Sequence, residues 1–308
     1  MAQKKKKIVF LVGPTGIGKS ASAILLAKKI NAEIISCDSM AVYRKMDIIA
    51  SKAASAQRKK IKHHLLDIVN PAQEYNVAKY RKDALTICDK IFLNRKIPLF
   101  VGGSGLYYSI IIDGLFPRVP EDKLIRAKLN KQLETRGSKY LYKRLVKIDQ
   151  AAAKKIHPND RRRVIRALEV YLKTGKQISV LQKNRIGLGK DYEIKIFGLN
   201  LEREALYHRV NLRVNKMFRL GLINEVKRLL KHKLSKTAAC AIGIGELKGY
   251  FNGTYSLGQA KRLIQRNSRH YAKRQLTWFR KDKRIQWINI NKMDSPVQVA
   301  LKIWKKLS

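Results

Sequence analysis

The chain of 308 residues has few cysteines and no long apolar segment, and both shortages limit what it can be. No stretch is long and apolar enough to span a bilayer, and Met1–Lys4 lacks the apolar segment of a signal peptide. The three cysteines, Cys37, Cys88 and Cys240, are widely spaced and lack the paired spacing of metal ligands. They are most simply free thiols of a reducing compartment, so we expect a cytoplasmic protein without membrane association.

Acidic residues are also scarce. The chain has 22 aspartates and glutamates against 67 lysines and arginines, which gives a formal net charge of +45. A field of this sign favours a polyanionic partner and speeds the encounter with it. Part of the excess has an alternative origin, because an AT-rich genome encodes much lysine and isoleucine. The positions of the basic residues are therefore better evidence for nucleic acid than their total.

One phosphate-binding pattern lies where such a pattern belongs. Ile8–Val12 predicts a buried strand, and Ala21–Ala27 predicts a helix. The segment between them matches a P-loop: Gly13, Pro14, Thr15, Gly16, Ile17, Gly18, Lys19 and Ser20. Its backbone N–H groups would face an anion, Lys19 would add a positive charge, and the Ser20 hydroxyl would ligate Mg²⁺. A phosphorylated ligand explains this segment better than a chance glycine turn.

Strands that alternate with helices predict the fold class: α/β, with a P-loop NTPase-like parallel sheet, helices on both faces and a helical insertion domain. Further strands are expected near residues 33–36, 97–101, 192–199 and 286–290, and long helices over 203–233 and 257–281. Residues 117–189 show helical periodicity and no convincing strand. We therefore expect a P-loop α/β catalytic core of residues 1–116 and 190–308, a helical insertion of residues 117–189, and a solvated arm at Lys4–Lys7.

Two of these strands end in residues of functional interest, since ligands of parallel sheets bind at the carboxyl ends of strands. Asp38 follows the second strand and either caps a turn or faces an acceptor substrate; we favour the substrate. Gly102–Gly105 follows the third strand and forms either a tight corner or a point of close substrate approach. That strand ends in glycine and not in a Mg²⁺-binding aspartate, which disfavours a motor or a GTPase.

Six segments occur in the order found in tRNA dimethylallyltransferases: Gly13–Ser20, Asp38–Tyr43, His63–Ile68, Gly102–Tyr107, His157–Asp160 and Tyr271–Arg280. Jointly they are specific, and the chain resembles this family over essentially its whole length. The resemblance implies transfer of a dimethylallyl group from dimethylallyl diphosphate to the exocyclic N6 amine of the adenosine just 3′ of the tRNA anticodon. It also implies Mg²⁺ as cofactor and no hydrolysis of ATP, the usual ligand of a P-loop.

This reaction suits particular residues. An allylic diphosphate ionises readily once its leaving group is neutralised, which Thr15, Lys19 and the P-loop N–H groups would promote. Arg209, together with Arg213 on the same helix face, would clamp the far side of the diphosphate. Asp38 would act as general base and accept a proton from the weakly nucleophilic adenine amine.

The resemblance further implies a set of tRNA-contacting residues. They are Asp38, Ser39, Met40, Ala41, Ser104, Arg126, Arg162, Arg163, Val164, Ile165, Arg166, Cys240, Ala241, Ile242, Gly243, Ile244 and Gly245. The chain departs from the family pattern at Ala41, where glutamine is frequent, and at Ile244 and Gly245, where tyrosine and another polar residue are usual. These departures affect substrate contacts and not the catalytic centre.

Basic residues at helical spacing supply further contacts with nucleic acid. The longer stripe consists of Arg262, Arg266, Arg269 and Lys273, and the shorter one of Arg162 and Arg166. Aromatic residues at such spacing usually belong to the core, which is the role we favour for Tyr271, Trp278 and Phe279. His63 and His64 lack a third ligand at sensible spacing, so we interpret them as structural.

Two other functions remain open. A P-loop small-molecule kinase, in which Asp38 would activate an acceptor hydroxyl, explains the P-loop but leaves the basic helices without a role. A non-enzymatic nucleic-acid-binding protein explains those helices and leaves the P-loop unused. No apolar stripe demands a partner, so we expect a monomer.

Overall fold

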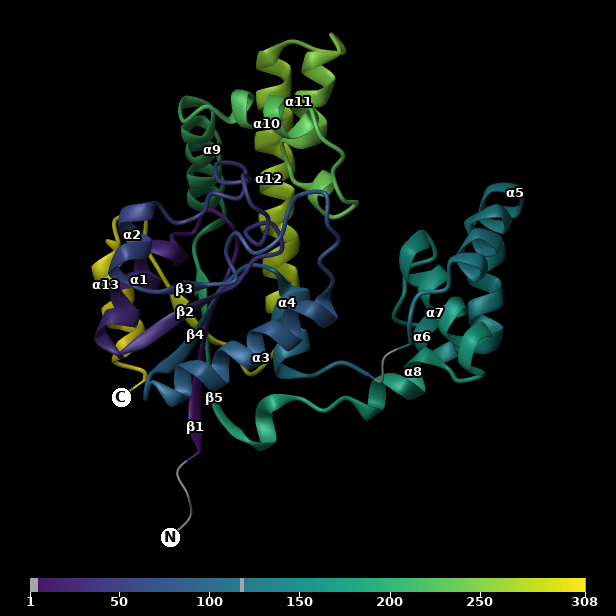
Figure 1. Cartoon of the computed structure of the whole chain (residues 1–308), viewed down its shortest axis with the longest axis horizontal. Helices are drawn as coiled ribbons and strands as arrows, with labels where there is room; N and C mark the ends of the chain where they lie inside the picture. The colour runs from purple at the N-terminus through teal and green to yellow at the C-terminus, as the bar shows by residue number, and fades with distance from the viewer. Residues whose placement is uncertain (1–4, 117–118, 308) are drawn as a thin grey trace. The chain divides into compact units, whose positions relative to one another are not determined.

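The computed structural model describes residues 5–116 and 119–307, and these residues form a six-stranded parallel sheet in the order β3-β2-β4-β1-β5-β6 (Figure 1). The strands are β1 (Lys6–Val12), β2 (Ala32–Cys37), β3 (His63–His64), β4 (Ile97–Gly102), β5 (Tyr192–Asn200) and β6 (Gln286–Asn289). β1 lies between β4 and β5, with Val9 opposite Leu99 and Lys195. This parallel α/β sheet with a P-loop at the end of β1 confirms the predicted fold class.

The first compact unit contains Met1–Ile111 and Gly189–Ser308. Its helices are α1 (Lys19–Lys29), α2 (Ser55–Lys60), α3 (Val77–Leu93), α4 (Gly105–Ile112), α9 (Arg203–Arg219), α10 (Leu222–Leu230), α11 (Ile244–Phe251), α12 (Leu257–Phe279) and α13 (Pro296–Trp304). Short 3-10 turns lie at Leu188–Lys190 and Ala238–Cys240. None of the helices in the described ranges is long and apolar enough to cross a membrane.

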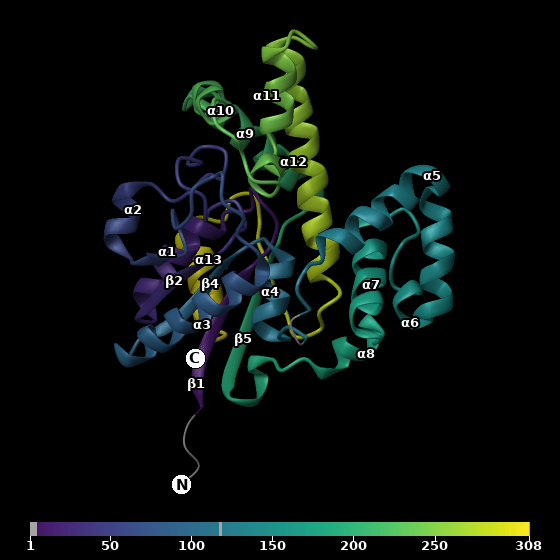
Figure 2. The same cartoon turned by 45° about the vertical axis from the view of Figure 1, so that its right-hand side comes forward.

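Helices cover both faces of the sheet, and successive strand residues point to opposite sides. On one side, Val9 and Leu11 pack in a cluster with Leu26 of α1 and Ile303 of α13, and these two helices lie side by side in both views (Figures 1 and 2). On the other side, the Phe10 ring stacks on Phe100 at 4.6 Å between centroids. The edge of Tyr108 meets Phe10, and Phe279 meets Tyr108, so α4 and α12 share this second core.

The second compact unit, Ile112–Leu188, has a hydrophobic core of its own. It consists of α5 (Lys123–Ile148), α6 (Gln150–Ala153), α7 (Arg161–Thr174), α8 (Ile178–Leu181) and a 3-10 turn, Gln182–Asn184. Leu141 and Leu145 of α5 pack with Val164 and Leu168 of α7. No strand occurs among the residues described in this unit. Pro117 and Arg118, where the sequence pattern changes, lie outside the described residues.

The structure differs from the sequence-based expectations at three places. Residues 203–233 do not form one helix, because Gly221 adopts a left-handed conformation, with φ 96°, and separates α9 from α10. The short strand β3 was not expected, and it pairs His63 and His64 with Ile34 and Ile35. The proposed N-terminal arm is also shorter than expected, because Lys6 and Lys7 already belong to β1, while Lys4 lies outside the described residues.

The carboxyl ends of β2 and β4 approach so closely that Gly102 has no room for a side chain. A Cβ atom there would lie 2.0 Å from the carbonyl oxygen of Cys37. The Gly102–Gly103 corner is therefore required by packing, in agreement with the tight-corner interpretation.

We expect Gly102→Ala to lower the free energy of unfolding by about 3 kcal/mol or more, because overpacking usually costs about 1–3 kcal/mol and here the clash is with backbone. Gly245→Ala on α11 is the control, since a Cβ at Gly245 would meet nothing within 4 Å. That change should be neutral or stabilise by about 0.5–1 kcal/mol. Urea unfolding of both variants measures the difference, and equal stabilities would contradict the packing argument.

Candidate active site

The P-loop connects β1 to the N-terminus of α1, and two of its carbonyl groups bind the side chain of Lys19. The Nζ of Lys19 donates to the carbonyl oxygens of Gly13 at 2.8 Å and Pro14 at 2.7 Å. Gly16 and Gly18 have φ values of 81° and 104°, a region that favours glycine. The loop is therefore held in a cradle shape by these contacts, with the exposed Ser20 at the start of the helix.

Lys19 lies in a strongly perturbed electrostatic environment. Burial, and secondarily the positive charge of Arg213, lower the pKa of Lys19 from 10.5 to about 7, while Asp38 opposes the shift. Burial likewise lowers the pKa of Arg213, and Asp38 again opposes. Two cations thus share one site with a single carboxylate. Such an arrangement favours a further anion, because a bound diphosphate would offset the repulsion between them.

Asp38 follows β2 and serves both roles considered for it. Its Oδ1 accepts the backbone N–H of Met40 at 2.8 Å, so Asp38 shapes the turn after the strand. The same carboxylate lies close enough to Lys19 to influence its pKa. The next residue, Ser39, donates its backbone N–H to the Oγ of Ser104 at 3.1 Å. The ends of β2 and β4 are therefore joined beside the carboxylate.

A tyrosine completes this side of the site. Burial, and secondarily Asp38, raise the pKa of Tyr271 to about 12, while a hydrogen bond with Ser104 opposes the shift. Burial also raises the pKa of Tyr107, with a smaller contribution from Asp38. Both phenols are protonated at neutral pH, and both lie near enough to Asp38 to be influenced by its charge.

Gln275 connects the two halves of the site, and the sequence analysis did not single it out. Its Oε1 accepts the backbone N–H of Thr15 at 2.8 Å, and its Nε2 donates to the carbonyl of Gly103 at 2.8 Å. The side chain is buried, and a Cβ at Gly103 would lie 2.2 Å from Nε2. The only available signal was its place in the segment Tyr271–Arg280.

Arg209 and Arg213 both face the P-loop region from α9. Arg209 donates to the carbonyls of Ile17 at 3.3 Å and Lys292 at 2.9 Å, which places it along the outside of the loop. Arg213 donates from Nε to the Oγ of Ser51 at 3.0 Å and lies nearer to Lys19 and Asp38. The structure brings together both predicted arginines, and it puts Arg213 closest to the carboxylate.

The loop after Asp38 is anchored by Glu225, a buried glutamate of α10 that the sequence analysis also missed. Its carboxylate accepts three backbone N–H groups, those of Asp47 at 3.0 Å, Ile48 at 2.8 Å and Ile49 at 2.8 Å. Ser51, two residues after Ile49, contacts Arg213, so this anchor also positions a partner of that arginine.

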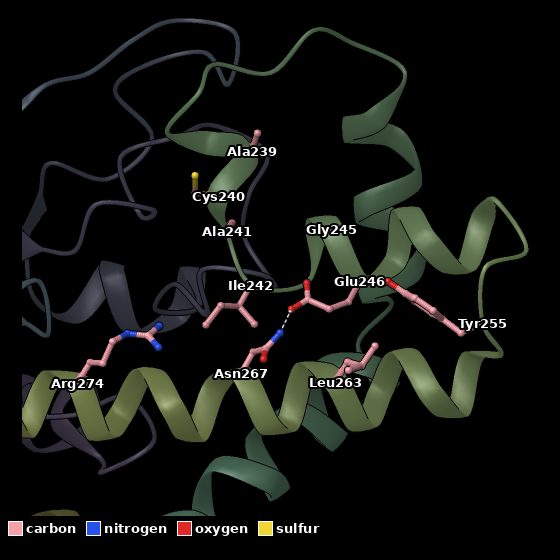
Figure 3. A pocket seen from close by; sticks show the side chains of 10 residues that line it. All are labelled: Ala239, Cys240, Ala241, Ile242, Gly245, Glu246, Tyr255, Leu263, Asn267 and Arg274. Carbon is pink, nitrogen blue, oxygen red and sulfur yellow. Dashed lines mark hydrogen bonds between the residues drawn. The ribbon is translucent and has the colours of Figure 1, made fainter. Parts of the chain in front are cut away.

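Four of the predicted tRNA-contacting residues, Cys240, Ala241, Ile242 and Gly245, line a hollow of about 500 Å³ between α11 and α12 (Figure 3). Asn267 and Arg274 project from α12 on its other side. The Oε1 of Glu246 accepts from Asn267 at 2.6 Å. Gly243 and Ile244 are buried, so the departure at Ile244 leaves an apolar side chain inside the fold. Gly245 has no side chain, so it leaves the edge of this hollow open.

Closer to Asp38, the predicted contacts differ in exposure. Ser39 and Met40 are half-buried, whereas Ala41 is 5% exposed and Ser104 is 8% exposed. A tRNA contact at Ala41 through its side chain therefore has little surface available. Ser104 acts mainly by holding Ser39 in place.

The predicted contacts in the second unit are divided between surface and core. Arg162 and Arg163 are exposed at the start of α7. Val164 and Ile165 are buried in the core of that unit, so their side chains present little surface. A third group surrounds Glu169, a fully buried acid that pairs with Arg126 at 2.9 Å and with Arg166 at 2.6 Å.

Helix α12 presents part of the predicted basic stripe. Arg262, Arg266 and Lys273 are exposed, whereas Arg269 donates to the Oδ1 of Asn211 on α9 at 2.7 Å. The interpretation of the aromatic residues was correct for Phe279, which is fully buried, and wrong for Trp278, which is 38% exposed. Trp278 lies outside the core because its indole packs on Gly105, the first residue of α4.

His63 and His64 have structural roles, as expected. His64 contacts Glu33 at 2.7 Å through Nε2, and Lys96 contacts the same carboxylate at 2.9 Å. No group of three or more histidine, cysteine, aspartate or glutamate side chains able to hold a metal occurs in the part of the chain that the structure describes. The Ser20 hydroxyl beside the loop fits Mg²⁺, which commonly takes few protein oxygens together with those of a phosphate.

Fold and site together define a P-loop-like α/β protein with a carboxylate, Asp38, near the lysine of the loop. A family model described as IPP transferase matches residues 41–282, and one described as isopentenyl transferase matches residues 6–74. The chain belongs to the IPP transferase family. This confirms the resemblance seen in the sequence.

Individual relatives agree over nearly the whole chain. The tRNA dimethylallyltransferase of Carboxydothermus hydrogenoformans is 47% identical over 93% of both chains, and that of Halothermothrix orenii is 45% identical over 93% of this chain and 88% of its own. The tRNA isopentenylpyrophosphate transferase of Bacillus halodurans is 37% identical, covers 99% of this chain and 97% of its own, and has a TM-score of 0.72. A eukaryotic dimethylallyltransferase acting on tRNA is 31% identical over 97% of this chain and 76% of its own, with a TM-score of 0.78.

The lowered pKa of Lys19 predicts a pH-dependent stability of the ligand-free protein. Between about pH 7 and 10.5 the unfolded chain holds a proton on Lys19 that the folded chain lacks, so the free energy of unfolding rises with pH. The slope from this group is at most about 1.4 kcal/mol per pH unit. Burial of the charged Lys19 ammonium destabilises the folded protein fully below pH 7, and this destabilisation disappears above pH 10.5.

Lys19→Met should remove this contribution. In urea unfolding from pH 6.5 to 9.5 without phosphate, we expect the wild-type protein to gain stability relative to the variant as the pH rises. Lys59→Met, at an exposed position, is the control and should run parallel to the wild type. If the stability of Lys19→Met also runs parallel to that of the wild type, Lys19 keeps its proton in the folded protein over this pH range. The pKa of Lys19 would then not be lowered by folding.

Proposed function

We propose that this protein transfers a dimethylallyl group from dimethylallyl diphosphate to the N6 amine of the adenosine 3′-adjacent to the tRNA anticodon, forming N6-isopentenyladenosine. The observation that carries the proposal is the position of Asp38, a carboxylate at a strand end next to the lysine of a P-loop. A phosphate cradle and a proton acceptor at one site suit a substitution at a carbon that bears a diphosphate. The relatives named tRNA dimethylallyltransferase support the choice of substrates.

The diphosphate belongs on the P-loop side. The N–H groups at the start of α1 and the Lys19 ammonium would face it, and Arg209 and Arg213 would close around it from α9. Lys19 would exchange its contacts with Gly13 and Pro14 for diphosphate oxygens and take up a proton. A Mg²⁺ ion near the Ser20 hydroxyl would supply further neutralisation of the leaving group.

The acceptor adenosine belongs on the Asp38 side. The bond between C1 of the dimethylallyl group and the bridging oxygen breaks, and the diphosphate leaves with the electron pair. The amine nitrogen forms the new bond to C1, and its proton passes to the Asp38 carboxylate. The adenosine has to leave its stack to reach this group, as other bases do when enzymes act on them.

The surfaces for tRNA follow from charge and exposure. We assign backbone contacts to Arg162 and Arg163 on the insertion and to the exposed arginines of α12. The hollow lined by Cys240, Ala241, Ile242 and Gly245 is the further contact region. We also propose that the protein acts as a monomer in the cytoplasm, where tRNA is modified.

Incubation of the protein with unmodified tRNA, Mg²⁺ and radiolabelled dimethylallyl diphosphate tests the function. We expect label in tRNA as N6-isopentenyladenosine, and no transfer of phosphate when ATP is the donor. Phosphate transfer from ATP to a small acceptor would instead establish a kinase. Binding of tRNA without transfer from either donor would leave a nucleic-acid-binding protein.

Asp38→Asn should lower turnover by about a hundredfold or more, the usual scale for loss of a general base. Asparagine retains an Oδ1 acceptor for the N–H of Met40, so the fold and the tRNA affinity should be preserved. Single-turnover rates at saturating substrates measure the effect. The control is Asp47→Asn, which changes an exposed carboxylate in the following loop. The turnover of this variant should equal that of the wild type. A rate for Asp38→Asn within a few-fold of the wild type would remove Asp38 from the base role.

Reversal of Arg262 and Arg266 to glutamate should weaken tRNA binding and flatten its dependence on salt. Each lost phosphate contact lowers the slope of log affinity against log salt by about one. Lys82→Glu with Lys90→Glu on α3 changes the net charge equally at two exposed positions and is the control. If both double variants shift the affinity alike, with unchanged slopes, only the total charge matters and α12 lies outside the interface.

A further inference from the structure

A strained serine lies at the end of the loop that Glu225 anchors. Ser51 is exposed, and its backbone φ of 47° lies in the left-handed region, which glycine and asparagine adopt more readily than serine. Such strain persists only where the surrounding structure imposes it, and strained residues of this kind cluster at functional sites. The contacts of Ser51 therefore indicate what its side chain does.

The Ser51 hydroxyl ends a chain of hydrogen bonds that begins at Glu225. The Glu225 carboxylate, on a residue that is 4% exposed, accepts the N–H of Ile48 at 2.8 Å. The carbonyl of Ile48 accepts the N–H of Ser51 at 2.9 Å and its hydroxyl at 3.2 Å. The hydroxyl proton is thus directed at Ile48, and the Oγ atom accepts the Nε–H of Arg213 at 3.0 Å. The orientation of this acceptor is set by the glutamate anchor.

A buried lysine holds the same loop from its other end. The side chain of Lys52 is 1% exposed, and its Nζ donates to the carbonyl of Tyr43 at 2.6 Å and to the carboxylates of Asp47 and Asp67. A buried charge is costly unless it is paired, so movement that broke these contacts would be strongly unfavourable. Ser51, directly before Lys52, therefore lies between two fixed points of the loop.

Arg213 has donors left for a ligand. Helix α9 rests on the P-loop one turn before it, since a Cβ at Gly16 would lie 2.9 Å from the Cγ2 atom of Val210. Within residues 5–116 and 119–307, the Nε of Arg213 has a hydrogen-bond partner and its two terminal nitrogens have none. No buried side-chain nitrogen of these residues lacks a partner, so the terminal nitrogens reach solvent. Because the guanidinium is planar, holding Nε fixes where this pair points, and such a pair can bind phosphate oxygens in a forked arrangement.

We propose that Ser51 and Glu225 are positioning residues that together aim the terminal nitrogens of Arg213 at the diphosphate. Ser51 holds the guanidinium by its Nε–H, and Glu225 keeps Ser51 in the conformation that this contact requires. The strain at Ser51 follows from this role, because glycine would relax the backbone but supply no hydroxyl. The inference rests on the proposed function, since it takes a diphosphate as the ligand of Arg213.

The Ser51→Gly variant separates positioning from support of the fold. Glycine adopts a φ of 47° without strain, so urea unfolding should show a variant at least as stable as the wild type. Calorimetry with inorganic pyrophosphate and Mg²⁺ should nevertheless show about fivefold weaker binding, the scale of one hydrogen bond. Asn31→Gly, at an exposed position with φ 51°, is the matched control and should bind pyrophosphate as the wild type does. Unchanged pyrophosphate affinity in Ser51→Gly would overturn the proposal.

A double-mutant cycle tests whether the effect passes through Arg213. Glu225→Gln turns an NH2 group toward backbone N–H donors, which should loosen the loop and weaken pyrophosphate binding as Ser51→Gly does. Arg213→Met should weaken binding by more than either change, and in its background neither should have a further effect.

A further loss of pyrophosphate affinity on adding Ser51→Gly to Arg213→Met would also overturn the proposal. The Ser51 results decide the outcome even if Glu225→Gln does not fold. A wild-type protein that binds pyrophosphate but transfers no dimethylallyl group would refute the proposed function, and the cycle would still test the role of Ser51.

Discussion

The side-chain amide of Gln275 occupies the point where the elements of the site meet. It accepts from the Thr15 N–H in the P-loop and donates to the Gly103 carbonyl after β4, so one residue of α12 fixes both strand ends. Hydrogen bonds inside a buried region are costly to leave unmade, which gives this bridge a strong geometric effect. The P-loop and the end of β4 are consequently linked through one side chain. The basic surface of α12 is part of the same rigid element.

Electrostatic repulsion inside the site is the second constraint. Lys19 and Arg213 lie near each other with Asp38 as their common counter-charge, and the pKa values of both cations are lowered. Without an anion, Lys19 relies on the carbonyls of its own loop. In the proposed function, a bound diphosphate would relieve this repulsion as well as attract both side chains. The arrangement also leaves Asp38 with neutral tyrosines around it, which suits a proton acceptor.

Some of the few acidic residues have structural roles inside the fold. Several of the few glutamates are buried as anchors: Glu33 holds His64 and Lys96, Glu169 holds Arg126 and Arg166, and Glu225 holds three backbone N–H groups. Arg162 on α7 and Arg262 and Arg266 on α12 are exposed and form no ion pair among the described residues, as a polyanion-binding surface requires.

The sequence by itself determined the P-loop and the place of Asp38 at a strand end, because both depend on neighbours within a few residues. The alternation of strands and helices indicated the parallel sheet, and helical periodicity indicated the insertion. The family could be identified from the order of its segments. Contacts between distant residues could not be predicted. Gln275 lies 260 positions from Thr15, and only folding shows that its amide reaches the loop. In the same way, Phe279 is buried while its neighbour Trp278 on α12 is partly exposed. Helical spacing alone does not show that the backbone of Gly105 lies against Trp278.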